Sequence, residues 1–88
     1  MHYESEVIMD RLDIRIRILR RILEIGSSDR HCIEAIFSSD GDSHIYVHDK
    51  RAGHAVVDSY DKRDNLDETS AFIFLDEWSQ IIRRERNK

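Results

Sequence analysis

Residues 32–60 constrain the fold most, because apolar and polar residues alternate there in short segments separated by turn-forming residues. The predicted strands are residues 32–38, 44–49 and 54–60. The Asp-Gly dipeptide within residues 39–42 is typical of a tight hairpin turn, and residues 49–53 predict a second, looser turn. The segment therefore predicts a three-stranded antiparallel meander.

The strand register follows from requiring one apolar face, because side chains alternate between the two faces of a sheet. We expect Phe37 to lie opposite Ile45, and His48 to lie opposite His54. The inward face would then hold Ile33, Ala35, Phe37, Ile45, Val47, Ala55 and Val57. The outward face would hold Cys32, Glu34, Ile36, His44, Tyr46, His48, His54, Val56 and Asp58.

Residues 6–25 precede the meander and have the period of an amphipathic helix. The stripe expected to face the core consists of Ile8, Leu12, Ile16, Leu19 and Leu23, widened by Ile18, Ile22 and Ile25. Gly26 stands where a helix commonly ends on a left-handed residue. The alternation of apolar and charged residues over 12–18 also fits a strand, but the length of the stripe favours a helix.

Residues 66–86 follow the meander and predict a second helix, and residues 65–68 have the spacing of a capping box, with Asn first and Glu last. One face of this helix would hold Ala71, Phe74, Leu75, Trp78, Ile81 and Ile82. Phe72 and Ile73 fall outside that face, which indicates either a deeper core or a surface that meets a partner or a second copy of the chain. A short strand over 71–75 is the alternative.

Together these elements predict one α+β domain over residues 1–88, in the order α-β-β-β-α, with the N-terminal and C-terminal helices on one face of the meander. This order resembles that of the double-stranded-RNA-binding domain. That family places lysines at the start of its last helix, where the backbone of the duplex lies. Residues 64–68 hold that position here and read Asp-Asn-Leu-Asp-Glu, so the resemblance is one of topology and does not imply duplex binding.

Charge, cysteine content and the length of apolar runs limit which partners and which cellular location are expected. The net charge is −4, and residues 29–82 hold twelve acidic and five basic residues, so a single basic face for duplex DNA is not expected. Cys32 is the single cysteine, which excludes an internal disulfide framework. No apolar run reaches the roughly 18 residues of a membrane span. We therefore expect a cytoplasmic protein with no membrane partner.

Two groups on the outward face consist of residue types that bind metal ions or catalyse reactions in other proteins. Glu34, His48 and His54 are metal-ligand types, but histidines and carboxylates also simply pair on solvated sheets, so they are weak candidates. A second group, made of Ser38, His44 and Asp58, has the residue types of a catalytic triad. A flat sheet offers no oxyanion donors and no pocket that excludes water, so neither catalysis nor a cofactor is predicted.

Protein binding is the better-supported use of this face. Ile36, Tyr46 and Val56 would form an apolar strip rimmed by polar groups, which is the anatomy of a protein-binding patch. Next to it, carboxylates recur at every third residue from Asp58 to Asp67, and such a row can imitate a phosphate backbone. The predicted partner-binding residues are Ile36, His44, Tyr46, Val56, Asp58, Asp61, Asp64 and Asp67.

The favoured function is therefore a small non-enzymatic protein–protein interaction module, with a homodimer as one form of partner. Its most specific version is an acidic inhibitor that blocks a nucleic-acid-handling protein. In size, acidity and element order the chain is similar to some small phage inhibitors of bacterial defence, including anti-CRISPR proteins. The first alternative is a nucleic-acid-binding module that uses Arg11, Arg15, Arg83, Arg84 and Arg86. The second is a metal site at Glu34, His48 and His54.

Overall fold

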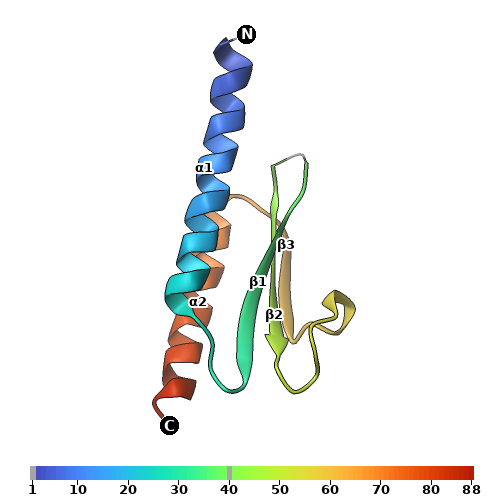
Figure 1. The fold of residues 1–88 in the computed structure, drawn as a ribbon, viewed down its shortest axis with the longest axis vertical. Helices are drawn as coiled ribbons and strands as arrows, with labels where there is room; N and C mark the ends of the chain where they lie inside the picture. Colours follow the sequence, from blue (N-terminus) through green and yellow to red (C-terminus); the bar gives the residue numbers. More distant parts are fainter. Residues whose placement is uncertain (1, 40) are drawn as a thin grey trace.

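The structure has the predicted α+β fold, in which two helices lie on one face of a three-stranded antiparallel sheet (Figure 1). This computed structural model describes residues 2–39 and 41–88, with side chains from Leu12 onward. The elements are α1 (His2–Ile25), β1 (His31–Phe37), β2 (Ser43–Asp49), the 3₁₀ turn η1 (Val56–Asp58), β3 (Asp61–Leu66) and α2 (Glu68–Arg86). The strand order β1-β2-β3 is that of a meander, which confirms the fold class.

The helix predicted at the start of the chain is present as α1. Of its predicted core stripe, the widening residues Ile18, Ile22 and Ile25 face the core, whereas the main row does not. Ile18 and Ile25 are 0% and 3% exposed, and Ile14 and Ile22 pack beside them. The predicted main row faces solvent instead, with exposed fractions of 49% for Leu12, 51% for Ile16, 45% for Leu19 and 81% for Leu23. The side chain of Ile8 lies outside the described residues. Because both faces of α1 are apolar, the periodicity alone could not decide which one meets the sheet.

The end of α1 is confirmed at Gly26. This residue has a φ of +69°, and its N–H donates to the carbonyl of Ile22 at 2.9 Å. Glycine adopts this left-handed conformation without steric cost, so it stops the helix and lets the chain turn toward β1.

β1 and β2 pair with the predicted facing of their side chains but in a different register. Phe37 lies opposite Ser43 and Ala35 lies opposite Ile45, so the predicted pairing of Phe37 with Ile45 is wrong by two residues. A shift of two residues keeps every side chain on its predicted face, whereas a shift of one would have reversed them. Asp40, which was predicted to lie in the turn between these strands, lies outside the described residues.

The predicted position of the third strand is wrong. Residues 54–60 form a loop that contains η1, and Val57 is 90% exposed. The chain returns to the sheet at Tyr60, whose N–H donates to the carbonyl of Val47 at 2.9 Å, and β3 follows directly. Ala55 and Val57 are therefore exposed loop residues and not part of the core face.

β3 is a strand despite its charged sequence, because α2 supplies partners for its inward side chains. Asp61 accepts a hydrogen bond from the indole N–H of Trp78 at 3.0 Å. The guanidinium of Arg63 lies over the ring of Phe74, 4.9 Å from its centroid. Near the end of the strand, Asn65 has a φ of +56°, next to an irregularity in the β2–β3 register. Because these contacts hold the inward side chains of β3, this edge strand forms without alternating apolar and polar residues.

α2 begins two residues later than predicted, because Asp67 and not Asn65 is its N-cap. The carboxylate of Asp67 accepts a hydrogen bond from the backbone N–H of Ser70 at 2.8 Å. This bond satisfies one of the free N–H groups of the first turn. The helix runs without interruption to Arg86, so the alternative strand over 71–75 is wrong.

The inward face of α2 agrees with the prediction. Its buried apolar residues are Ala71, Phe74, Leu75, Trp78 and Ile82, and Ile81 packs against them. Phe72 also packs against this core, whereas Ile73 is 56% exposed.

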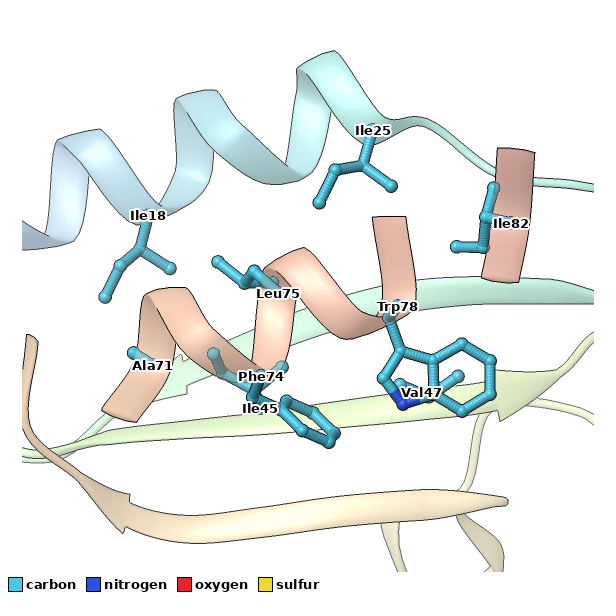
Figure 2. Packing of buried hydrophobic residues seen from close by; sticks show 9 residues of the cluster. All are labelled: Ile18, Ile25, Ile45, Val47, Ala71, Phe74, Leu75, Trp78 and Ile82. Carbon is cyan, nitrogen blue, oxygen red and sulfur yellow. The ribbon is translucent and has the colours of Figure 1, made fainter. Parts of the chain in front are cut away.

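The core lies between the two helices and the inward face of the sheet (Figure 2). Its buried residues are Ile18, Ile25, Ile45, Val47, Ala71, Phe74, Leu75, Trp78 and Ile82. α1 contacts β1 and α2, while α2 contacts β2 and β3, so the two helices share the cover of one sheet face. Among the residues that the structure describes, neither helix is long and apolar enough to span a membrane.

Candidate protein-binding surfaces

On the outward face of the sheet, the side chains that lie opposite each other differ from the groups that the sequence predicts. The direct cross-strand neighbours are Cys32 with His48, Glu34 with Tyr46, and Ile36 with His44. On the other side of β2, Lys62 of β3 lies opposite Tyr46. These neighbours differ from the predicted ones for two reasons. The β1–β2 register differs by two residues from the predicted register, and a different segment forms β3.

Glu34, His48 and His54 nevertheless come together. The Nε2 atom of His48 lies 3.2 Å from Oε1 of Glu34, and the His48 ring stacks on the ring of His54 with centroids 5.2 Å apart. The side chain of His48 is 0% exposed, and its Nδ1 has no hydrogen-bond partner in the structure. Within the described part of the chain, no three His, Cys, Asp or Glu side chains are placed to hold a metal ion. The group is a stack of two imidazole rings with one histidine–carboxylate contact.

Cys32 lies beside this group, with its Sγ 4.0 Å from Nε2 of His54. Burial raises the pKa of the Cys32 thiol, the charge of Glu34 raises it further, and Lys50 opposes the rise. The thiol thus stays protonated at neutral pH, which disfavours a reactive thiolate.

Tyr46 is not the exposed centre of an apolar strip, because it is only 8% exposed. Its hydroxyl donates to Oδ1 of Asp64 at 3.2 Å, and Nδ1 of His44 lies 3.3 Å from the same oxygen. Burial raises the pKa of Tyr46, and the hydrogen bond and charge of Asp64 and the charge of Glu34 add to the rise. Of the predicted strip, Ile36 is 43% exposed and Val56 is partly buried. The strip therefore offers a partner little apolar surface.

The predicted group of Ser38, His44 and Asp58, which has the residue types of a triad, does not come together. The Ser38 hydroxyl donates to the carbonyl of Asp42 at 3.1 Å, and His44 pairs with Asp64 instead of Asp58. Asp58 lies in η1, outside the sheet.

The predicted carboxylate row is largely occupied within the chain. Asp61 accepts from Trp78 and pairs with Arg63 at 2.7 Å, and Asp64 accepts from Tyr46. Asp67 caps α2, and the hydrogen bonds from Ser70 lower its pKa. Oδ2 of Asp64 also lies 3.9 Å from Nζ of Lys62, so three of the four carboxylates of the row have partners within the chain.

The arginines of the nucleic-acid hypothesis do not form one face in the described residues. Arg15 donates to the carbonyl of Ser38 at 2.6 Å and lies over the ring of Phe37, 5.6 Å from its centroid. The other described arginines of the set, Arg83, Arg84 and Arg86, are in the last turn of α2. The side chain of Arg11 lies outside the described residues.

A buried polar group that the sequence analysis missed joins the end of α2 to β1. His31 is 3% exposed, and its Nδ1 lies 2.7 Å from Oε2 of Glu85. The hydroxyl of Ser28 donates to Oε1 of Glu85 at 2.7 Å. The His31 ring also packs against Tyr60 and Trp78, with centroids 4.7 and 5.1 Å apart. In the sequence, the one indication that His31 is buried is its spacing: it lies an even number of residues before Ile33, Ala35 and Phe37, and residues so spaced on a strand share a face.

The electrostatics of this group fit a structural role. Burial opposes the ionisation of Glu85, but hydrogen bonds from His31 and Ser28, together with the positive charges of His31 and Arg30, outweigh that effect and lower its pKa. Glu85 is thus held as a carboxylate that fastens the last turn of α2 to the loop after α1.

A groove of about 380 Å³ lies between α1 and α2, with partly buried Phe72 in its lining. Ion pairs bridge the two helices here, from Arg17 to Glu68 at 2.7 Å and from Arg21 to Asp76 at 3.2 Å. These carboxylates balance the arginines, so the groove is not a strong anion site.

Among the described residues, four of the eight exposed large hydrophobic side chains form a row on α1 that was predicted to face the core. We call it the outward stripe, and it consists of Leu12, Ile16, Leu19 and Leu23. With 3.6 residues per turn, its centre lies roughly a third of a turn away from the inward face of Ile18 and Ile25. α1 stands at the margin of the molecule, and its N-terminal half extends past the sheet (Figure 1). The stripe is thus open to a partner along its length.

Comparisons with protein families, with curated proteins and with solved structures give no match for this chain.

Proposed function

We propose that this chain is a protein-binding module without a catalytic activity of its own, and that the outward stripe of α1 is its binding surface. The observation that carries the proposal is the exposure of these four aliphatic side chains, between 45% and 81%, along one side of one helix. The neighbouring side of the same helix already supplies the core, so the stripe is not needed to build the fold.

The physical argument rests on the number and spacing of the exposed residues. Single exposed aliphatic residues are ordinary, but a continuous apolar row commonly marks an interaction site. Moving one leucine or isoleucine side chain from water to an apolar interior stabilises by about 1.5–3 kcal/mol. Spacings of four, three and four residues are those by which an amphipathic helix enters a groove or pairs with another helix.

The more specific version, an acidic inhibitor of a nucleic-acid-handling protein, remains a prediction. The net charge of −4 supports it. The carboxylate row supports it less, because Asp61, Asp64 and Asp67 each have partners within the chain. The nucleic-acid alternative has less support still, because Arg15 is bound to the carbonyl of Ser38, away from the arginines in the last turn of α2. The metal alternative is weak because, among the described residues, no three His, Cys, Asp or Glu side chains are placed to hold an ion.

A pair of matched variants tests the proposal. Leu23 and Val57 are the two most exposed large aliphatic residues among those described, at 81% and 90%, and they lie on different surfaces. Leu23→Glu and Val57→Glu therefore introduce the same charge at little cost to the fold. Tagged wild type and both variants are used to capture proteins from a lysate after nuclease treatment, with bound proteins quantified by mass spectrometry.

We expect Leu23→Glu to reduce specific capture at least tenfold and Val57→Glu to leave it unchanged. Equal capture by all three proteins contradicts the outward stripe as the binding surface. A loss confined to Val57→Glu moves the site to the loop around η1, and material that disappears with nuclease favours the nucleic-acid alternative.

A further inference from the structure

We infer that the partner of the outward stripe is a second copy of this chain, whose α1 lies antiparallel to the first. This inference rests on the proposed function, since it names the occupant of the same surface. The four stripe residues have the spacing of the d, a, d and a positions of a heptad repeat, in the order Leu12, Ile16, Leu19 and Leu23.

The stripe is complementary to itself in the antiparallel orientation. Reversing a row with spacings of four, three and four residues returns the same spacings. Leu12 then lies opposite Leu23 of the second copy, and Ile16 lies opposite Leu19 of the second copy. A twofold axis between residues 17 and 18 generates the whole contact, as expected for an isologous dimer.

The charges beside the stripe select this orientation. Asp13 and Arg20 both occupy the e position, one residue after Leu12 and Leu19. In the antiparallel pair, e positions face each other, so Asp13 meets Arg20 of the second copy on both sides of the axis. In a parallel pair, e positions face g positions instead of each other, so neither of these ion pairs could form.

Both charged side chains are available for this contact. Among the described residues, Arg20 forms no ion pair, and its side chain is exposed. Asp13 pairs with Arg17 at 3.3 Å but remains 68% exposed, so it can accept a second cation. Glu24 and Arg21, which lie toward α2, take no part in the contact.

The expected dimer is a reversible one. A stable interface usually buries about 800 Å² on each partner, and four half-exposed side chains supply only a few hundred. The dimer should therefore dissociate on dilution.

Sedimentation equilibrium of the purified full chain over a wide concentration range tests the interface. We expect the wild-type mass to rise from the chain mass of 10.5 kDa toward twice that value. Val57→Glu should behave like the wild type, and Leu23→Glu should weaken association at least tenfold. A dimer that Leu23→Glu leaves intact would overturn the inference.

Charge reversal tests the orientation. Asp13→Arg places like charges together in an antiparallel homodimer, and so does Arg20→Asp, so each variant alone should associate more weakly. Mixed together they restore both ion pairs, and native mass spectrometry with one ¹⁵N-labelled variant should show mainly the mixed dimer. A statistical mixture, or no gain on mixing, overturns the antiparallel arrangement. Circular dichroism of each variant checks that α1 is intact.

The outcomes separate the inference from the proposed function. A wild type that stays monomeric throughout, but captures another protein through Leu23, refutes the self-association and retains the protein-binding module. A monomer whose capture does not depend on Leu23 refutes both.

Discussion

α1 has two faces of nearly the same composition and with opposite environments. The inward face holds Ile14, Ile18, Ile22 and Ile25, and the outward stripe holds Leu12, Ile16, Leu19 and Leu23. Both sets are aliphatic and helically spaced, yet Ile18 is 0% exposed and Leu23 is 81% exposed. Apolar content therefore shows that a helix face can be buried, but it does not show which element will cover that face.

The largest expected difference between the faces is in the free energy of unfolding. Ile18→Ala should lower it by about 2–5 kcal/mol, because the variant leaves a cavity against Leu75 in the core. Leu19→Ala, one residue further along the same helix, should change it by no more than about 0.5 kcal/mol. Urea denaturation checks both values.

These measurements need a protein concentration at which the chain is monomeric, because association stabilises the folded state by mass action. Repeating them at high concentration should then reveal a cost for Leu19→Ala alone. Equal costs for the two variants at low concentration would show that the outward stripe is also part of the monomer's core.

A smaller change in the free energy of unfolding is expected for the buried polar group of Ser28, His31 and Glu85, which fastens α2 to the chain just after α1. Glu85→Ala should lower the free energy of unfolding by about 1–3 kcal/mol at pH 7, because buried His31 and Ser28 lose their acceptor. Arg84→Ala, at the exposed neighbouring position of α2, is the matched control and should have little effect.

The cost of Glu85→Ala should depend on pH. The folded-state pKa of Glu85 is lowered, so its stabilisation is complete above the ordinary glutamate value of about 4.3 and is lost as the pH falls through the lower folded-state pKa. Thermal unfolding of wild type and variant between pH 3 and pH 7 measures this, and the two curves should converge at the acid end. A constant separation would contradict the role of the Glu85 carboxylate.

The last prediction concerns the smallest change in the free energy of unfolding. It compares two arginines of α1, one beside the inward face and one beside the outward stripe. Arg15→Ala should lower the free energy of unfolding by about 1–2 kcal/mol, because it removes the bond to the carbonyl of Ser38 and the contact with Phe37. Arg20→Ala should leave the monomer within about 0.5 kcal/mol of wild type while weakening the dimer. Urea denaturation at low concentration and sedimentation equilibrium distinguish the two; matching results for both arginines would remove the distinction between the faces.

Local sequence signals were sufficient to predict the elements in which several such signals agree. The long 3.6-residue period and Gly26 determined that α1 is a helix and where it ends. Alternation in β1 and β2 determined which side chains point inward, even though the register differed by two residues. Both results depend on short-range geometry, namely the helical period and the alternation of a strand.

Contacts between residues distant in the sequence select the third strand, the buried face of α1 and the surface left for a partner. Residues 54–60 have strand propensity and remain a loop, while the charged segment 61–66 becomes β3 because Trp78 and Phe74 receive its inward side chains. The outward stripe is exposed because one sheet and one neighbouring helix can cover only one side of α1. These outcomes depend on which distant residues meet, and no local pattern contains that information.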